Sequence, residues 1–453
     1  MKEPEKQKRT DLKKLNLKNK NAITLIALVV TIVVLLILAG VTISLLLDEN
    51  GIIAKSKDAR NANRAGAIKE EITLWKADKF AADNGAGSHE SMDDFLARLK
   101  TRGLIDDDEI QTIKDTRELQ VGKEIIKFPS DAKTLVQAFK DEEIKVGDYL
   151  NYNDYVDESK TYTTKTNENG WADQKYTATK NTYWQVLGLD ETGERLMLIS
   201  QSPIKKEMKT SDTAEEWEKT PYLVLKGAYG YVNCEKILND ISGIYSTSLG
   251  KAESLTAEEI NRLIGVTVDF ANKKVYANSD PSTNIDGWGV LGNQDTYTAG
   301  DYTPESYINN KTHATAGTQT DPATAYRYQW GNLTINDTLK TILFNGTTND
   351  ANFAKSYWLA SPAVFVYSGN AYFGPGSVVN GDVNDYYSLF LSNGGWYANS
   401  FGVRPVVYLE SNITVEDLHK IDGQEEDWSA YSNGDAVANG NSSNGEAGNH
   451  GTK

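Results

Sequence analysis

A run of 25 residues without a charged side chain, Ile23 to Leu47 (ITLIALVVTIVVLLILAGVTISLLL), constrains this chain most strongly. As an α-helix it would be about 37 Å long, against about 30 Å for a bilayer hydrocarbon core. Residues 1–20 carry eight Lys or Arg and three acidic residues, so residues 1–22 are expected to be a basic cytoplasmic leader. The run therefore predicts a transmembrane helix at 23–47. The protein is expected to be a single-pass protein of the cell membrane, with most of the chain outside the cell. A cleaved secretory peptide is the alternative.

Charge and cysteine content exclude several classes of site. The formal net charge of -16 argues against nucleic acid as a partner, because nucleic-acid binding needs clustered Lys or Arg. Cys234 is the only cysteine, so an intrachain disulfide and a multi-cysteine metal site are excluded. We expect Cys234 to be a buried structural thiol.

The residues that follow the apolar run predict a small α+β unit at 48–130. Its first helix has one apolar face, made of Ile68, Ile72 and Trp75. A second helix is expected to start after Ser91, a good N-cap, and to stop at Gly103. Residues 118–128 (ELQVGKEIIKF) have strand-like runs around a Gly-Lys connection and predict a hairpin.

The stretch AITLIALVVTIVVLLILAGV resembles the N-terminal segment of type IV pilins and pseudopilins. The resemblance covers about the first 75 to 130 residues and implies a stalk domain on a long helix, with other pilin subunits as partners. It also implies a prepilin peptidase that cuts between Ala22 and Ile23. Ala22 stands where the family has Gly, and Ala27 stands where it has Glu. A permanently anchored single-span protein is the alternative.

From about residue 145 the pattern becomes that of a β-rich domain. Segments such as IKVGDYLNY and NTYWQVLGLDETGERLMLISQSPI predict strands, and two amphipathic helices are expected at 234–246 and 255–266. Thr256 with Glu259 forms a capping box for the second of these helices. The polar, Thr-rich residues 157–181 are interpreted as a surface loop. Residues 423–453 lack Ile, Leu, Phe and Met and predict a disordered tail.

Residues 359–403 differ in composition from the rest of the chain. These 45 residues contain two charged side chains, Asp382 and Asp385, whereas 24% of the whole chain is charged. Gly, Ser, Asn and Tyr supply 23 of the 45. Antibody loops favour the same four residue types, because Tyr offers a large contact area and the others offer adaptable hydrogen bonds. The stretch predicts a ligand-binding surface; a Gly/Asn-rich β region with ordinary turns is the alternative.

The segments YWQVLG, SYWLASP and GVRPVVYL resemble the C-type-lectin-like fold of formylglycine-generating-enzyme-like domains and of variable proteins diversified by retroelements. The resemblance covers roughly residues 145–410. The fold class expected for the whole chain is therefore α+β. It consists of a long N-terminal transmembrane, pilin-like helix with a small α+β stalk domain, followed by a C-type-lectin-like mixed domain with a β-sheet and two helices.

In the retroelement targets, mutation of adenines in AAY codons yields residues such as Asn, Tyr, Ser, Asp and Gly but not Lys, Glu, Gln, Met or Trp. The composition of 359–403 fits the residue types that such mutation can produce, except at Trp396. Trp396 would be an untargeted scaffold position, and its exposed face would still add to binding. The resemblance thus implies these ligand-binding residues: Tyr367, Asn370, Tyr372, Asn380, Asp382, Asn384, Tyr386, Tyr387, Asn393, Trp396, Tyr397 and Asn399.

Motifs of enzymes and metal sites are missing from the sequence. His89 begins HESMD, which lacks the second His of HExxH, no Ser lies in a GxSxG elbow, and no P-loop is complete. We therefore expect no catalytic residues, no metal and no cofactor. The expected function is that of a bacterial cell-surface, adhesin-type protein that binds an unknown extracellular protein or glycan. The alternatives are a structural minor pilin or pseudopilin, and a surface carbohydrate hydrolase that uses Asp382 and Asp385.

Overall fold

The computed structural model describes residues 30–36, 52–83, 87–129, 131–285, 296–297, 302–309, 319–320, 326–329, 336–344, 356–367, 369–379, 381–384 and 387–423. The chain divides into two compact units, Met1–Asp131 and Ala132–Lys453. Each unit has its own hydrophobic core and is described by itself.

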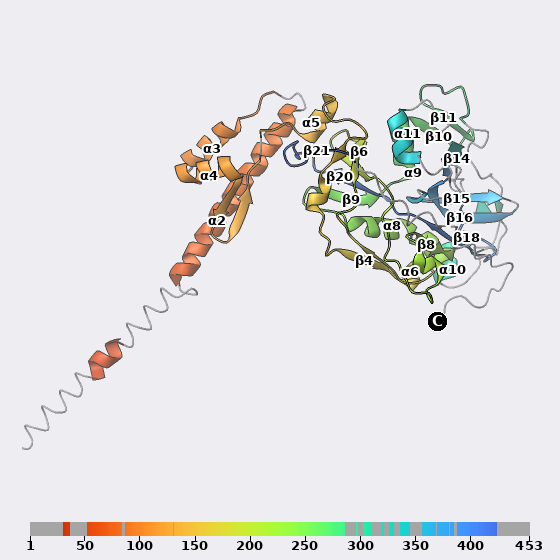
Figure 1. Cartoon of the computed structure of the whole chain (residues 1–453), viewed down its shortest axis with the longest axis horizontal. Coiled ribbons are helices and arrows are strands. Elements are labelled where there is room, and N and C mark those ends of the chain that lie inside the picture. Colours follow the sequence, from red (N-terminus) through yellow and green to blue (C-terminus); the bar gives the residue numbers. More distant parts are fainter. Residues whose placement is uncertain are drawn as a thin grey trace, which may run out of the picture. The chain divides into compact units, whose positions relative to one another are not determined.

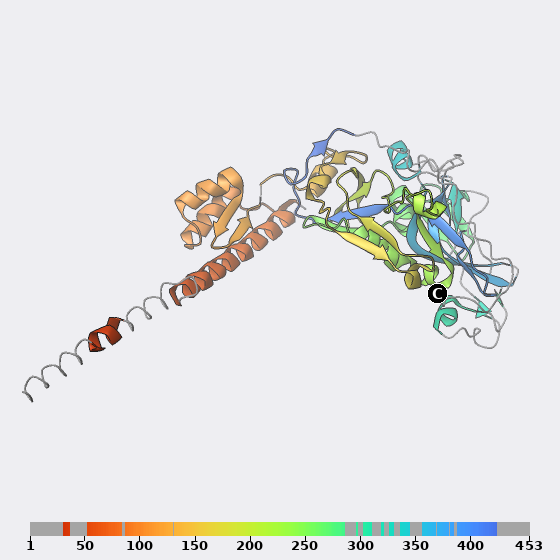
Figure 2. The same ribbon diagram turned by 60° about the horizontal axis from the view of Figure 1, so that its bottom comes forward.

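The first unit packs two short helices and a hairpin against one long helix. The elements are α2 (Ile52–Asp83), α3 (Met92–Thr101), α4 (Asp107–Thr116), β1 (Glu118–Val121) and β2 (Glu124–Lys127). Figure 1 shows α3, α4 and the hairpin next to α2, and in Figure 2 all three lie on one side of it. The predicted apolar face of α2 is confirmed, because Ile68, Ile72 and Trp75 are all buried in this core.

The helix and hairpin predictions for this unit are confirmed by their caps and pairing. The Ser91 side chain accepts a hydrogen bond from the Asp94 amide and caps α3. The backbone N–H of Met92 donates to both carboxylate oxygens of Asp131, at 3.0 and 2.8 Å. β1 and β2 pair antiparallel, with Val121 opposite Glu124 across the turn.

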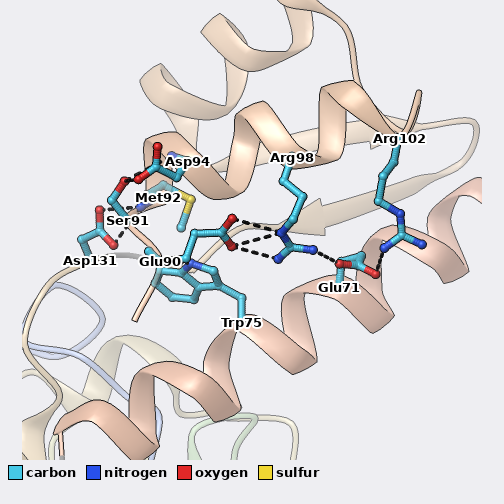
Figure 3. Close-up of polar contacts among 9 residues, drawn as sticks. All are labelled: Glu71, Trp75, Glu90, Ser91, Met92, Asp94, Arg98, Arg102 and Asp131. Atoms are coloured by element: carbon cyan, nitrogen blue, oxygen red, sulfur yellow. Dashed lines mark hydrogen bonds and ion pairs between the residues drawn. The ribbon is translucent and has the colours of Figure 1, made fainter. Parts of the chain in front are cut away.

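A polar network fastens α3 to α2 (Figure 3). Glu71 of α2 is 6% exposed and accepts hydrogen bonds from Arg98 and Arg102, both on or next to α3. Arg98 also pairs with Glu90, whose backbone carbonyl accepts a hydrogen bond from the Trp75 indole at 3.0 Å. Burial opposes ionisation of Glu71, but the two arginines outweigh it and lower the pKa of that carboxyl.

The second unit is built on an antiparallel six-stranded sheet of order β21-β3-β6-β7-β20-β9. The strands are β3 (Tyr149–Leu150), β6 (Trp184–Leu189), β7 (Leu196–Ser200), β9 (Gly250–Ser254), β20 (Pro405–Leu409) and β21 (Lys420–Ile421). The segments YWQVLG and GVRPVVYL thus supply β6 and β20, as predicted. Trp184 of the first segment is fully buried.

A second, five-stranded sheet holds much of residues 359–403. Its path is β14-β17-β16-β15, and β18 also pairs with β16. The strands are β14 (Arg327–Gln329), β15 (Tyr357–Tyr367), β16 (Asn370–Val379), β17 (Asp382–Asn384) and β18 (Phe390–Leu391). Four strand pairs stand apart: β4 (Thr161–Thr164) with β5 (Gln174–Thr177), β8 (Leu223–Lys226) with β19 (Ala398–Phe401), β10 (Val266–Asp269) with β11 (Lys274–Ala277), and β12 (Thr296–Tyr297) with β13 (Gln319–Thr320).

Helices α8 (Cys234–Gly243) and α9 (Ala257–Ile264) confirm the two amphipathic helices predicted for this unit. Thr256 and Glu259 form the predicted capping box at the start of α9. α8 packs against both β9 and β15, so it contacts both sheets (Figure 1). Cys234, the first residue of α8, is buried, and burial raises the pKa of its thiol to about 12.

The predicted fold class is corrected at the N-terminus. In the residues that the structure describes, no helix is both long enough and apolar enough to cross a membrane. A long N-terminal transmembrane helix is therefore not a feature of the described fold, which is mixed α/β with many small sheets. Of the run at 23–47, the structure describes residues 30–36, which are helical.

The second unit also differs from the expected single sheet with two helices. Further helices are α5 (Leu135–Lys140), α6 (Thr166–Asn169), α7 (Gly227–Val232), α10 (Pro304–Asn309) and α11 (Asp337–Phe344), joined by the 3-10 turns η1 (Tyr152–Tyr155) and η2 (Glu216–Lys219). The helices α5, α6, α7 and α10 have four to six residues each, which is too few turns to show a helical period. Residues 157–181 are not a surface loop, since β4 and β5 form a hairpin there with Tyr176 fully buried.

Candidate functional site

Several residues expected to bind or to be processed fall in turns or outside the described residues. Tyr367 and Asn370 face each other across the turn between β15 and β16, and Asn384 ends β17. Asn380, Asp385 and Tyr386, the processing residues Ala22 and Ile23, and the tail predicted at 423–453, beyond Gly423, lie outside the described residues.

Three of the predicted residues have contacts inside the fold. Asp382 is 1% exposed and forms an ion pair with Arg327, whose Nε lies 3.0 Å from Oδ2. Asp382 therefore does not face solvent, which argues against it as a ligand contact or as a hydrolase carboxylate. Tyr372 stacks on Phe365 with ring centroids 4.8 Å apart, and Tyr387 meets the edge of Phe401 at 4.9 Å. Both tyrosines are half-buried.

A tight hairpin turn between β18 and β19 brings the remaining four predicted residues together. Gly394 has φ +86°, a conformation that favours glycine, and its N–H donates to the Leu391 carbonyl at 2.9 Å. The Asn393 side chain accepts from the Gly395 amide, so the backbone turns within three residues. Asn393 is exposed, and Trp396, Tyr397 and Asn399 are half-buried.

The pairing of β19 with β8 places Trp396 against Lys226. Ala398 of β19 lies opposite Lys226, the last residue of β8. The Lys226 Nζ lies 3.9 Å from the centroid of the Trp396 ring and 4.9 Å from that of the Trp171 ring. Both contacts are within the range of cation–π attraction. Figure 1 shows β8, α6 and α10 gathered at the same part of the unit.

Trp171 reaches Lys226 because of the way α6 ends. Gly170 has φ +74°, and a Cβ added there would lie 2.1 Å from the carbonyl oxygen of Lys226. Only glycine fits so close to β8 in that conformation. The buried Asn169 side chain then accepts the N–H of Trp171 at 2.6 Å and fixes the residue that follows.

The contacts continue from Trp171 to a second lysine. Trp171 meets Trp217 of η2 edge to face, with centroids 6.2 Å apart. The Nζ of Lys206 lies 4.8 Å from the Trp217 centroid. We call these residues the Lys–Trp cluster: Lys206, Trp217, Trp171, Lys226 and Trp396.

Two polar atoms of the cluster are buried without a hydrogen-bond partner in the described structure: the Lys206 Nζ and the Trp171 indole nitrogen. Lys206 is 3% exposed. Burial lowers the pKa of Lys206 to about 7, against the opposing charge of Glu218. Burial also lowers the pKa of the half-buried Lys226. An ammonium group in such surroundings gains most from an anion that reaches it.

A pocket of about 650 Å³ lies elsewhere in the unit, between β4, α8 and β9. Its charged groups already have partners: Lys160 donates to the Ser246 carbonyl, Lys251 pairs with Glu253, and Asp240 pairs with Lys236. The pocket therefore offers less unmet charge than the Lys–Trp cluster. No group of three or more His, Cys, Asp or Glu suited to a metal occurs in the part of the chain that the structure describes.

Sequence reasoning identified Trp396 but missed the other four cluster members. Trp171 follows an Asn-Gly pair that ends a short helix, and the β-branched threonines on both sides of it were a strand signal. Lys206 and Lys226 carry no local pattern, since only the β8–β19 pairing and the tertiary contacts bring them to the rings.

Comparisons with protein-family models, with curated proteins and with solved structures found no match to this chain.

Proposed function

We propose that the second unit is a recognition domain that binds a protein or glycan ligand through the hairpin turn at 391–399 and the Lys–Trp cluster beside it. The observation that carries this proposal is the placement of Trp396 between the Asn/Tyr-rich turn and Lys226. The proposal retains the adhesin-type role expected from the sequence, with the ligand met outside the cell. The resemblance to retroelement-diversified proteins stays a prediction.

Binding would combine two kinds of contact. Trp396 and Trp171 are both half-buried, and an indole ring offers a ligand a flat apolar face. Asn393 and Tyr397 next to them provide hydrogen-bonding groups. The backbone beneath is held firmly, because the Tyr397 carbonyl accepts from Gly227 at 3.0 Å and its N–H donates to Leu389 at 2.8 Å.

Replacing Trp396 with alanine is expected to weaken binding of the ligand by tenfold or more, because aromatic anchors of this kind contribute about 2 kcal/mol or more. The full chain is screened against an array of glycans and surface proteins, and the affinity for each bound ligand is then compared between wild type and W396A. The matched control is Phe270→Ala, an aromatic residue that is 40% exposed and follows the last residue of β10.

Equal loss of binding in W396A and F270A would contradict the proposal, and so would a ligand that W396A binds as tightly as wild type. Unchanged far-ultraviolet circular dichroism and an unchanged unfolding midpoint of W396A show that the fold is intact. The Trp396 side chain leaves the backbone beside Gly227, where an added Cβ would lie 3.6 Å from the Trp396 Cβ. Trp396→Phe therefore serves as a milder variant, with an intermediate loss expected.

A further inference from the structure

The two lysines of the Lys–Trp cluster differ from many others in the second unit. Ion pairs with carboxylates hold Lys133, Lys165, Lys175, Lys209, Lys219, Lys236 and Lys251. Within the described residues, the amine of Lys226 has neither a hydrogen bond nor an ion pair, and its contacts are the two indole rings. The Lys206 amine likewise has no hydrogen-bond partner there. Two lysine amines that lack a hydrogen-bond partner within the described residues thus lie along one row of indole rings.

The charge of the whole chain limits which anion such a site attracts. A net charge of -16 repels long polyanions, and two lysines replace too few counterions to hold a nucleic acid. The half-buried Lys226 is instead suited to one carboxylate at a time, since a charge-assisted hydrogen bond is strong where water is partly excluded.

The rings and amides around Lys226 identify the rest of the ligand. Half-exposed indole faces stack on the C–H faces of pyranose rings, which are flat and apolar on one side. Asn393 lies on the adjoining turn, and amide side chains pair well with hydroxyl groups. A ligand with flat rings, many hydroxyls and spaced carboxylates meets all three features.

We propose that the Lys–Trp cluster binds an acidic saccharide of the uronic-acid class, with a carboxylate on Lys226 and sugar rings against Trp171 and Trp396. This inference rests on the proposed recognition function and names the ligand class of the same site. No covalent step is involved.

The test uses three probes that distinguish the contribution of the ligand's carboxylates from that of its sugar rings. Isothermal calorimetry and tryptophan fluorescence measure binding of the full chain to tetra-galacturonate, to its methyl ester, and to tetra-glutamate. The acid is expected to bind at least tenfold more tightly than either comparison probe, and binding of the acid is expected to weaken as salt rises. Lys226→Met is expected to lose tenfold or more, and Lys226→Arg to retain most affinity. Lys114→Met, which removes an ion-paired lysine of the first unit, is the matched control.

Each other outcome overturns the inference. If the acid and its methyl ester bind equally well, no ligand carboxylate contacts Lys226. This result depends on no protein variant. Equal binding of tetra-glutamate identifies an acidic peptide instead of a saccharide. Absence of tetra-galacturonate binding, or K226M and K114M behaving alike, also overturns it. The proposed recognition function survives these results if W396A still reduces binding of an array ligand, and it fails separately if W396A does not.

Discussion

Replacing Arg404 with leucine is expected to lower the free energy of unfolding of the second unit by about 4 kcal/mol. Arg404 is 4% exposed and lies just before β20. Its guanidinium donates hydrogen bonds to the backbone carbonyls of Ser200 at 2.9 Å, Gln201 at 3.0 Å and Ile342. Leucine would leave these carbonyls without their donor, and a buried acceptor without a partner costs about 1–3 kcal/mol.

The effect of R404L is measured as the shift in the guanidinium chloride midpoint, followed by near-ultraviolet circular dichroism. Arg404→Lys is expected to cost about half as much, because one ammonium cannot reproduce the fork of donors that the guanidinium presents. Arg262→Leu, at an exposed position of α9, is the control and should change the free energy of unfolding by less than about 1 kcal/mol. Equal midpoints for R404L and R262L would contradict the role assigned to Arg404.

Replacing Lys206 with methionine is expected to stabilise the second unit at pH 6 by about 4–5 kcal/mol and to change its stability little at pH 10.5. The Lys206 pKa is about 7 in the folded protein, below its ordinary value of 10.5. Between pH 7 and pH 10.5 the unfolded chain binds more protons than the folded chain. The free energy of unfolding of wild type therefore rises with pH over this range. Below pH 7 the Lys206 amine is protonated in both states, so the folded protein bears the whole cost of burying its charge.

The pH dependence of K206M is measured by chemical unfolding at several pH values between 6 and 10.5. Methionine fits the length of the lysine stem without its charge. The control is Lys205→Met, the exposed neighbour, whose effect should be small and constant with pH. A K206M variant that is less stable than wild type at pH 6, or whose effect does not change with pH, would contradict the burial of an uncompensated amine at this position.

Lys206 is buried and lowers the stability of the second unit, so we expect its amine to have a role in function. Natural sequences depart from local rules chiefly at functional sites, where the departure is tolerated for function. Lys206 and Lys226 lie on the same row of rings as Trp396. K206M is therefore expected to be more stable but not to bind more tightly.

Local signals predicted the elements that are built from neighbouring residues. The capping box at Thr256 and Glu259 fixed the start of α9, and the Ser91 cap fixed that of α3. Short apolar runs found β6 and β20. These signals act over three to seven residues, so tertiary contacts do not override them.

Properties that depend on distant residues were not predictable. The composition of Asp382 and its neighbours indicated solvent exposure, but Arg327, 55 positions away, holds the carboxylate inside the sheet. The polarity of residues 157–181 hid a hairpin whose buried Gln174 side chain bonds both the N–H and the carbonyl of Val224. The candidate site likewise depends on long-range pairing, since β8 and β19 are far apart in the chain.

Sequencing of codons 359–403 in one natural population of this gene is the most direct test of whether the recognition surface is diversified. If this surface is a diversified ligand site, substitutions will gather at exposed or half-buried positions such as Asn370, Tyr372, Asn393, Tyr397 and Asn399. They will spare Phe390 and Ala398, which are buried. A uniform sequence across the population, or substitutions spread equally over buried and exposed positions, would contradict a diversified binding surface.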